Sequence, residues 1–143
     1  MSALSYYESR PGMLSCSADK AYSFITDMRN FKRFVDEGKI TDWQANMDSC
    51  SFAVAMIGRV NFRIKEKDEG RRVVYEGDAL SKNDFMIEVN LSNLQEGNAE
   101  AKLNLSADLN PVMKMMADKP VRQFMEMIMD EIEKFRDWDN TIT

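Results

Sequence analysis

The sequence of 143 residues contains no histidine, and this absence excludes several kinds of chemistry at once. A Ser-His-Asp triad and a Cys-His pair both need an imidazole ring, and histidine is the commonest metal ligand in proteins. The sequence also lacks a glycine-rich phosphate loop, a dinucleotide-binding glycine fingerprint and a spaced cluster of cysteines. We therefore expect neither a metal ion nor a cofactor.

Cysteines, basic clusters and long apolar runs are also scarce. The first ten residues hold no apolar signal-peptide segment, so we expect a cytoplasmic protein in which Cys16 and Cys50 are reduced and buried. The longest strongly apolar run, Phe52 to Gly58, is far shorter than the about 20 residues of a transmembrane helix. The net charge is −5 and no basic cluster exceeds Arg71-Arg72, which argues against nucleic-acid binding.

The composition that remains is that of one globular domain. Apolar residues make up 44% of the chain and charged residues 30%, which is typical of a folded domain rather than a disordered segment. The chain has no linker, repeat or low-complexity tract, so we interpret residues 1–143 as a single domain.

The N-terminal third predicts one interrupted strand followed by two short helices. The stretch Ala3 to Ser15 is rich in strand-forming residues, and Arg10-Pro11-Gly12 places a bend or bulge within it. Ser17 is a good N-cap for the first helix, and Asn30 is an N-cap candidate for the second. Gly38 is expected to end the second helix.

From Ile40 to Leu109 the apolar residues recur with a period of two, which predicts strands. The alternation is clearest from Phe85 to Leu91 and from Ala99 to Ala107, and Lys67 to Gly70 reads as a hairpin turn. Such alternation implies an antiparallel sheet with one packed and one solvated face, and therefore helices on one side of it. The predicted fold class is α+β.

The C-terminal stretch from Asn110 to about Trp138 reads as one long amphipathic helix. Asn110 suits the N-cap and Pro111 the first helical position, while Pro120 predicts a kink or a restart. Six of the 12 methionines of the chain lie in this stretch. Its apolar stripe is either simply core or, in its methionine-rich part, the lining of a ligand cavity, because methionine adapts to irregular space. Three methionines off the centre of the stripe either widen it or are exposed on a partner surface: Met115, Met127 and Met129.

Two carboxylates in one predicted strand are the weak candidates for catalysis. Val73, Val74 and Tyr75 are contiguous, so the facing of this strand is ambiguous. If Val74 points inward, so do Glu76 and Asp78, and burial would raise their pKa values toward the range of a general base. If Val73 and Tyr75 point inward, both acids are solvated, and we favour this orientation because unpaired buried acids are rare.

The order of these elements resembles the helix-grip fold of the START/Bet v 1-like superfamily, which includes polyketide cyclase/dehydrase-like proteins (SRPBCC). The stretch Ser17 to Phe31, with its capping serine, aromatic residue, aspartate and second short helix, is similar to the opening of this superfamily. The resemblance implies a seven-stranded curved antiparallel sheet, with two short helices after the first strand, wrapped around the last helix with a cavity between. Members bind lipids, sterols, polyketides or plant hormones, some are cyclases and some are co-chaperone domains. No catalytic residues are shared throughout, so none is transferred.

The leading hypothesis is the binding or carriage of a small hydrophobic or amphipathic molecule, lipid-like or polyketide-like, between the sheet and the last helix. One alternative is a cyclase- or dehydratase-type enzyme that uses Glu76 or Asp78. Another is a protein-interaction domain or homodimer that uses exposed methionines such as Met115 and Met129. The residues expected to line the cavity are Phe34, Phe52, Phe62, Phe85, Met113, Met116 and Phe124.

Overall fold

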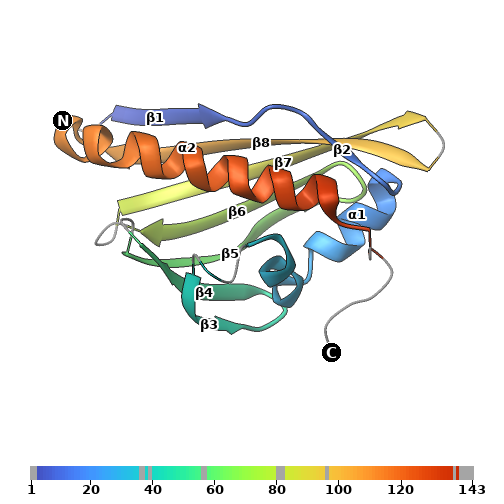
Figure 1. Cartoon of the computed structure of the whole chain (residues 1–143), viewed down its shortest axis with the longest axis horizontal. Coiled ribbons are helices and arrows are strands. Elements are labelled where there is room, and N and C mark those ends of the chain that lie inside the picture. Colours follow the sequence, from blue (N-terminus) through green and yellow to red (C-terminus); the bar gives the residue numbers. More distant parts are fainter. Residues whose placement is uncertain are drawn as a thin grey trace.

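The computed structural model of the protein describes residues 3–35, 38, 40–55, 58–79, 83–95, 97–136 and 138. One curved sheet carries a long C-terminal helix across one face, with the short helices at one end (Figure 1). This is the α+β arrangement that the sequence predicts. The elements are, in chain order, β1 (Ala3–Glu8), β2 (Gly12–Leu14), α1 (Ala18–Ile25), the 3-10 helix η1 (Met28–Phe34), β3 (Ile40–Ala45), β4 (Ser49–Val54), β5 (Gly58–Asp68), β6 (Arg72–Ala79), β7 (Asn83–Gln95), β8 (Asn98–Leu109) and α2 (Pro111–Lys134).

The sheet is an antiparallel meander whose first strand returns to pair with the last. The strand order is β1-β8-β7-β6-β5-β4-β3, and β2 also pairs with β8. Glu8 of β1 lies opposite Asn104, and Gly12 of β2 lies opposite Ala101 on the same strand. The predicted strand with a bend is therefore two strands that share one neighbour. The sheet contains eight strands but is seven strands wide.

The predicted helix starts are right for α1 and wrong for the second helix. Ser17 caps α1, since its Oγ accepts a hydrogen bond from the Lys20 backbone N–H at 3.2 Å. The cap of η1 is Asp27, whose Oδ1 accepts from the Arg29 N–H at 3.1 Å. Asn30 is instead fully buried and donates its Nδ2–H to the Phe24 carbonyl oxygen at 3.0 Å. The helix η1 ends at Phe34, before Gly38.

Helix α2 begins as predicted but does not restart at the proline. The Asn110 Oδ1 accepts from the Met113 N–H at 2.8 Å, and Pro111 is the first helical residue. The helix then runs through Pro120 to Lys134, a few residues short of the predicted end. Pro120 has no backbone N–H to donate, and the helix tolerates this loss because packing of its buried face stabilises it. This face is formed by Ala117, Met125, Ile128, Met129 and Ile132.

An arginine in the bend between β1 and β2 fixes the second half of α2 against this edge of the sheet. The Arg10 guanidinium lies 2.5 Å from an Asp130 carboxylate oxygen and 3.0 Å from one of Glu133. Glu133 also accepts a hydrogen bond from the Met13 backbone N–H at 3.2 Å. Each contact is partly exposed and contributes little alone, but together they set where α2 crosses the sheet.

Among the residues that the structure describes, no helix combines the length and apolarity needed to cross a membrane. The same described part of the chain holds no group of three or more cysteine or acidic side chains placed to bind a metal ion.

Candidate ligand-binding site

The interior between the sheet and α2 contains a largely enclosed apolar cavity of about 50 Å³. Pockets that hold drug-sized ligands measure about 300–1,000 Å³, so this cavity is too small to hold one as it stands. Its lining comes from both short helices, four central strands and α2. The described lining residues are Ile25, Phe31, Phe34, Phe62, Tyr75, Ile87, Val89, Leu103, Leu105, Phe124, Met125, Ile128 and Ile132.

Aromatic rings in edge-to-face contact form much of the cavity wall. The ring centre of Phe62 lies 4.9 Å from that of Phe31 and 5.9 Å from that of Tyr75, with the planes nearly perpendicular in both pairs. Such T-shaped contacts are favourable beyond the area they bury. Strand alternation on β5 and β6 places Phe62 and Tyr75 on the inner face, so these walls follow directly from the sheet.

Tyr75 is the one polar side chain among the described residues that line the cavity. Its hydroxyl donates a hydrogen bond to the Ile25 carbonyl oxygen at 2.9 Å. Burial raises the pKa of this phenol. The hydroxyl is therefore neutral and already bonded, and it links β6 to the end of α1 rather than serving as a base.

A second, open hollow lies beside the cavity, between α2 and the ends of β3 and β4. This groove has a volume of about 570 Å³. Its walls are mostly apolar, with Lys119 and Gln123 as the polar side chains from α2. The described residues that line it are Gly38, Ile40, Val54, Ala55, Met116, Lys119, Pro120, Gln123, Phe124 and Met127.

Phe124 is the wall that the cavity and the groove share, since its side chain lines both. The residue is half-buried, and its ring stacks on Phe52 with the ring centres 6.2 Å apart and the planes 22° apart. Phe52 is itself fully buried. Phe124 is thus the one described residue that lines both the largely enclosed apolar cavity and the open groove.

The seven residues expected to line a cavity fall into two groups. Phe34, Phe62 and Phe124 line the cavity, and Met116 and Phe124 line the groove. Phe52, Phe85 and Met113 are absent from the described lining of both hollows. Phe52 lies behind Phe124, Phe85 packs 6.2 Å from Phe62, and Met113 is half-buried near the start of α2. The alternation of apolar residues identifies the side chains that point into the core. It does not show which of them border a cavity.

The two carboxylates considered for catalysis lie on the outer face of the sheet. The Arg63 guanidinium donates to Glu76 Oε1 at 2.7 Å, and Asn61 Nδ2 donates to Asp78 Oδ1 at 3.0 Å. Tyr75, which precedes them in β6, points into the cavity instead. Neither acid is among the described residues that line the cavity or the groove, as the favoured orientation of this strand predicts.

A buried tyrosine at the other edge of the sheet forms a polar cluster that the sequence does not reveal. The Tyr7 hydroxyl donates to an Asp118 carboxylate oxygen at 2.5 Å, and Lys114 Nζ lies 3.0 Å from the same oxygen. Burial and the Asp118 carboxylate raise the pKa of Tyr7 to about 12. Residues 111 positions apart make this contact, so no local pattern predicts it. The cluster ties β1 to α2.

Both thiols are buried, as the sequence predicts. Cys16 lies just before α1, and Cys50 lies in β4. Burial raises the pKa of the Cys50 thiol to about 12. A nucleophilic cysteine needs a lowered pKa and access to solvent, so Cys50 does not have the properties of a reactive thiol.

The chain has the helix-grip fold of the START/Bet v 1-like superfamily. One structure that shows this is norcoclaurine synthase from Thalictrum flavum, with a TM-score of 0.72, 8% identity, and coverage of 93% of this chain and 86% of that chain. A point mutant of that synthase in complex with a transition-state analogue gives a TM-score of 0.69, at 8% identity, over 94% of this chain and 97% of that chain.

A START superfamily protein from Mycobacterium smegmatis aligns over 92% of this chain and 97% of its own, with a TM-score of 0.60 and 9% identity. No protein-family model matches the chain, and no curated protein sequence matches it. At identities this low the likeness concerns the fold, and residue roles do not transfer.

Proposed function

We propose that this protein binds a small amphipathic molecule in the groove between α2 and the ends of β3 and β4, with the apolar part of the ligand directed past Phe124 into the interior. The observation that carries this proposal is that Phe124 lines both an open groove and a largely enclosed apolar cavity. Proteins with this fold commonly bind hydrophobic molecules in the same space between sheet and helix.

The volumes of the groove and the cavity fit a ligand that lies mostly in the groove with one apolar end in the interior. The groove of about 570 Å³ lies within the range of ligand pockets, whereas the cavity of about 50 Å³ would hold only the end of an apolar chain or ring. Rotation of the Phe124 ring away from Phe52 would join the two spaces. The adaptable side chains that surround this point include Met116 and Met127 in the groove and Met125 in the cavity.

The polar side chains at the groove favour a ligand with an acidic head. Lys119 lines the groove, is exposed, and forms no ion pair with any residue in the described part of the chain. Gln123 lies one helical turn further on and can donate through its amide. A carboxylate placed between them would gain a charge-assisted hydrogen bond while its chain lies along Phe124.

Replacement of Lys119 by glutamine tests this placement with cis-parinaric acid, a fluorescent long-chain acid. We expect the wild-type protein to bind the acid with a rise in fluorescence, and Lys119→Gln to raise its Kd about three- to fivefold, the size of a partly exposed charge contact. The methyl ester of the same acid is the matched control, and its Kd should be the same for both proteins.

The proposal fails if the acid does not bind at all, or if Lys119→Gln raises the Kd of the acid and the Kd of the ester equally. Lys134, which is exposed on the far end of α2, supplies the control substitution, and Lys134→Gln should leave both affinities unchanged.

A further inference from the structure

The first two turns of α2 expose an apolar surface that the sheet does not cover. Val112, Met115 and Met116 are 66%, 82% and 65% exposed, and their spacing of three and four places them on one side of the helix. Ala117 in the same turns is buried toward the sheet. Single exposed apolar residues are ordinary on protein surfaces, whereas three adjacent ones form a patch that indicates an interaction.

The charge of α2 changes along its length, and the apolar patch lies in its positive half. From Pro111 to Arg122 the helix carries three cations, Lys114, Lys119 and Arg122, and one carboxylate, Asp118. From Gln123 to Arg136 the chain carries four carboxylates and two cations. The amino terminus of the helix adds the positive end of its dipole. The chain as a whole is acidic, with a net charge of −5, so this half of α2 is a local exception.

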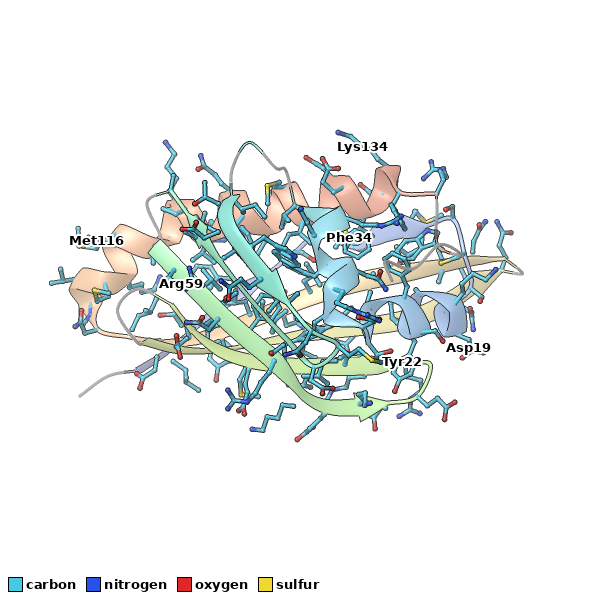
Figure 2. All side chains as sticks on the ribbon, turned by 90° about the horizontal axis from the view of Figure 1, so that it is seen from below. Asp19, Tyr22, Phe34, Arg59, Met116 and Lys134 are labelled. Atoms are coloured by element: carbon cyan, nitrogen blue, oxygen red, sulfur yellow. The ribbon has the colours of Figure 1, made fainter. Side chains whose placement is uncertain are left out.

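A further cation lies at the same end of the molecule. Figure 2 shows Arg59 on β5 and Met116 on α2, both in the half of the molecule opposite Asp19. Arg59 is exposed, and it lies opposite Ala53 on β4, beside the strand end that forms the groove. The exposed carboxylate Asp108, at the end of β8, alternates onto the outer face of the sheet away from α2. Lys114 pairs with Asp118, whereas Lys119 and Arg122 are exposed and form no ion pair within the described residues, so this half of α2 carries unpaired positive charge.

The size and charge of the patch favour a lipid surface over a second protein as its partner. Three side chains of this kind form a patch of a few hundred Å², below the about 800 Å² that each partner of a stable protein dimer buries. A lipid surface needs less, because a few apolar side chains that enter the headgroup region are assisted by Lys and Arg near anionic lipids. Like charges around the patch also disfavour a symmetric pairing of two copies.

We propose that Val112, Met115 and Met116, with Lys119 and Arg122 on the same helix and Arg59 in the same half of the molecule, dock the protein on the surface of a membrane that contains anionic lipids. In this position the groove, which Met116 and Lys119 also line, opens against the lipid surface. The docking surface goes beyond ligand binding in the groove, and either can exist without the other.

Sedimentation with vesicles tests this surface. The wild-type protein should sediment with vesicles of phosphatidylcholine and phosphatidylserine at low salt, bind pure phosphatidylcholine at least about tenfold more weakly, and dissociate as salt is raised. Met115→Asp should reduce binding at least about tenfold, because it places a carboxylate in the apolar patch that meets the anionic surface. Arg122→Gln should reduce vesicle binding about fivefold, as for one basic residue near an anionic surface.

Met47→Asp is the matched control, since Met47 is 56% exposed in the turn between β3 and β4. The Met47→Asp protein should bind the vesicles as the wild type does.

Absence of binding to the anionic vesicles at low salt overturns the inference, as does equal loss for Met115→Asp and Met47→Asp. A wild-type dimer in sedimentation velocity that Met115→Asp converts to a monomer would assign the patch to a second copy of the chain instead. Met115 is not among the described residues that line the groove, so Met115→Asp should still bind cis-parinaric acid in solution. This separates a failure of docking from a failure of ligand binding.

Discussion

Substitution of Gly77 by alanine is expected to lower the free energy of unfolding by about 3 kcal/mol or more, the upper range for overpacking of a close-packed interior. A Cβ atom at this position would overlap the Asn61 carbonyl oxygen and lie 2.5 Å from Phe62 Cβ. The first is backbone of the neighbouring strand, so it cannot move aside as the end of a flexible side chain would. Gly77 lies opposite Phe62 on one side and Phe85 on the other, and its lack of a side chain lets β5 and β6 approach closely beneath the cavity.

Urea denaturation measures this effect, and Gly97→Ala is the comparison. Gly97 has φ of +82°, and a Cβ atom there would meet nothing within 4 Å, so alanine brings backbone strain of about 1–2 kcal/mol but no clash. We expect the urea midpoint of Gly77→Ala to fall by more than about 1 M, and further than that of Gly97→Ala. A Gly77→Ala protein within about 1 kcal/mol of the wild type would show that β5 and β6 are not packed this closely.

Replacement of Phe124 by alanine is expected to open the interior. The change removes the shared wall and joins the cavity of about 50 Å³ to the groove. The lost burial and the lost stacking on Phe52 should cost about 2–3 kcal/mol of stability, below the usual range for a buried phenylalanine because Phe124 is only half-buried. If rotation of this ring limits entry, and the open form is about a tenth of the population, cis-parinaric acid should associate about tenfold faster.

Met125→Ala is the matched control for this prediction. Met125 is buried on α2 one residue away and lines the cavity but not the groove, so its truncation enlarges the interior without opening it. It should cost a similar free energy of unfolding and leave the association rate unchanged in stopped-flow fluorescence. The association rate of Phe124→Leu should lie between those of the wild type and Phe124→Ala. Equal acceleration by Phe124→Ala and Met125→Ala would contradict a specific role for the Phe124 ring.

Much of the fold follows from local patterns because the physical causes are local. The alternation from Ala99 to Ala107 places five small or branched apolar side chains on one face of β8, and all are buried. The Asn110-Pro111 pair starts α2 because the amide side chain accepts a backbone N–H and proline needs no partner there. These are interactions between residues close in sequence.

The error at Asn30 and the ambiguity at Val74 arise where tertiary contacts override local preference. Asn30 has the side chain of a helix cap, yet it is buried and satisfies the Phe24 carbonyl at the end of α1. Val74 breaks the alternation of β6 because it is buried on the outer face. There Arg72 bridges Glu66 and Glu88, the residues opposite Val74 on the two neighbouring strands. A sequence pattern does not show contacts across strands of this kind.

The candidate site was predictable as a region but not as a set of residues. Inward parity identifies Phe62 and Tyr75, and the apolar stripe of α2 identifies Phe124, yet the same features identify Phe52 and Phe85, which lie in the packed wall. Whether a core side chain borders a cavity depends on small differences in distance between segments far apart in the chain. The groove depends on how far the ends of β3 and β4 lie from α2, which no local pattern encodes.

The methionines of this chain allow a direct test of where the ligand lies. With ¹³C-labelled methionine methyl groups, a titration with cis-parinaric acid can be followed by NMR at positions distributed over the molecule. The account predicts shifts for Met116 and Met127 in the groove and for Met125 in the cavity, while the exposed Met13 and Met47 keep their positions. Shifts confined to Met13 or Met47, or no shift of any methyl group at saturating acid, would contradict binding between the sheet and α2.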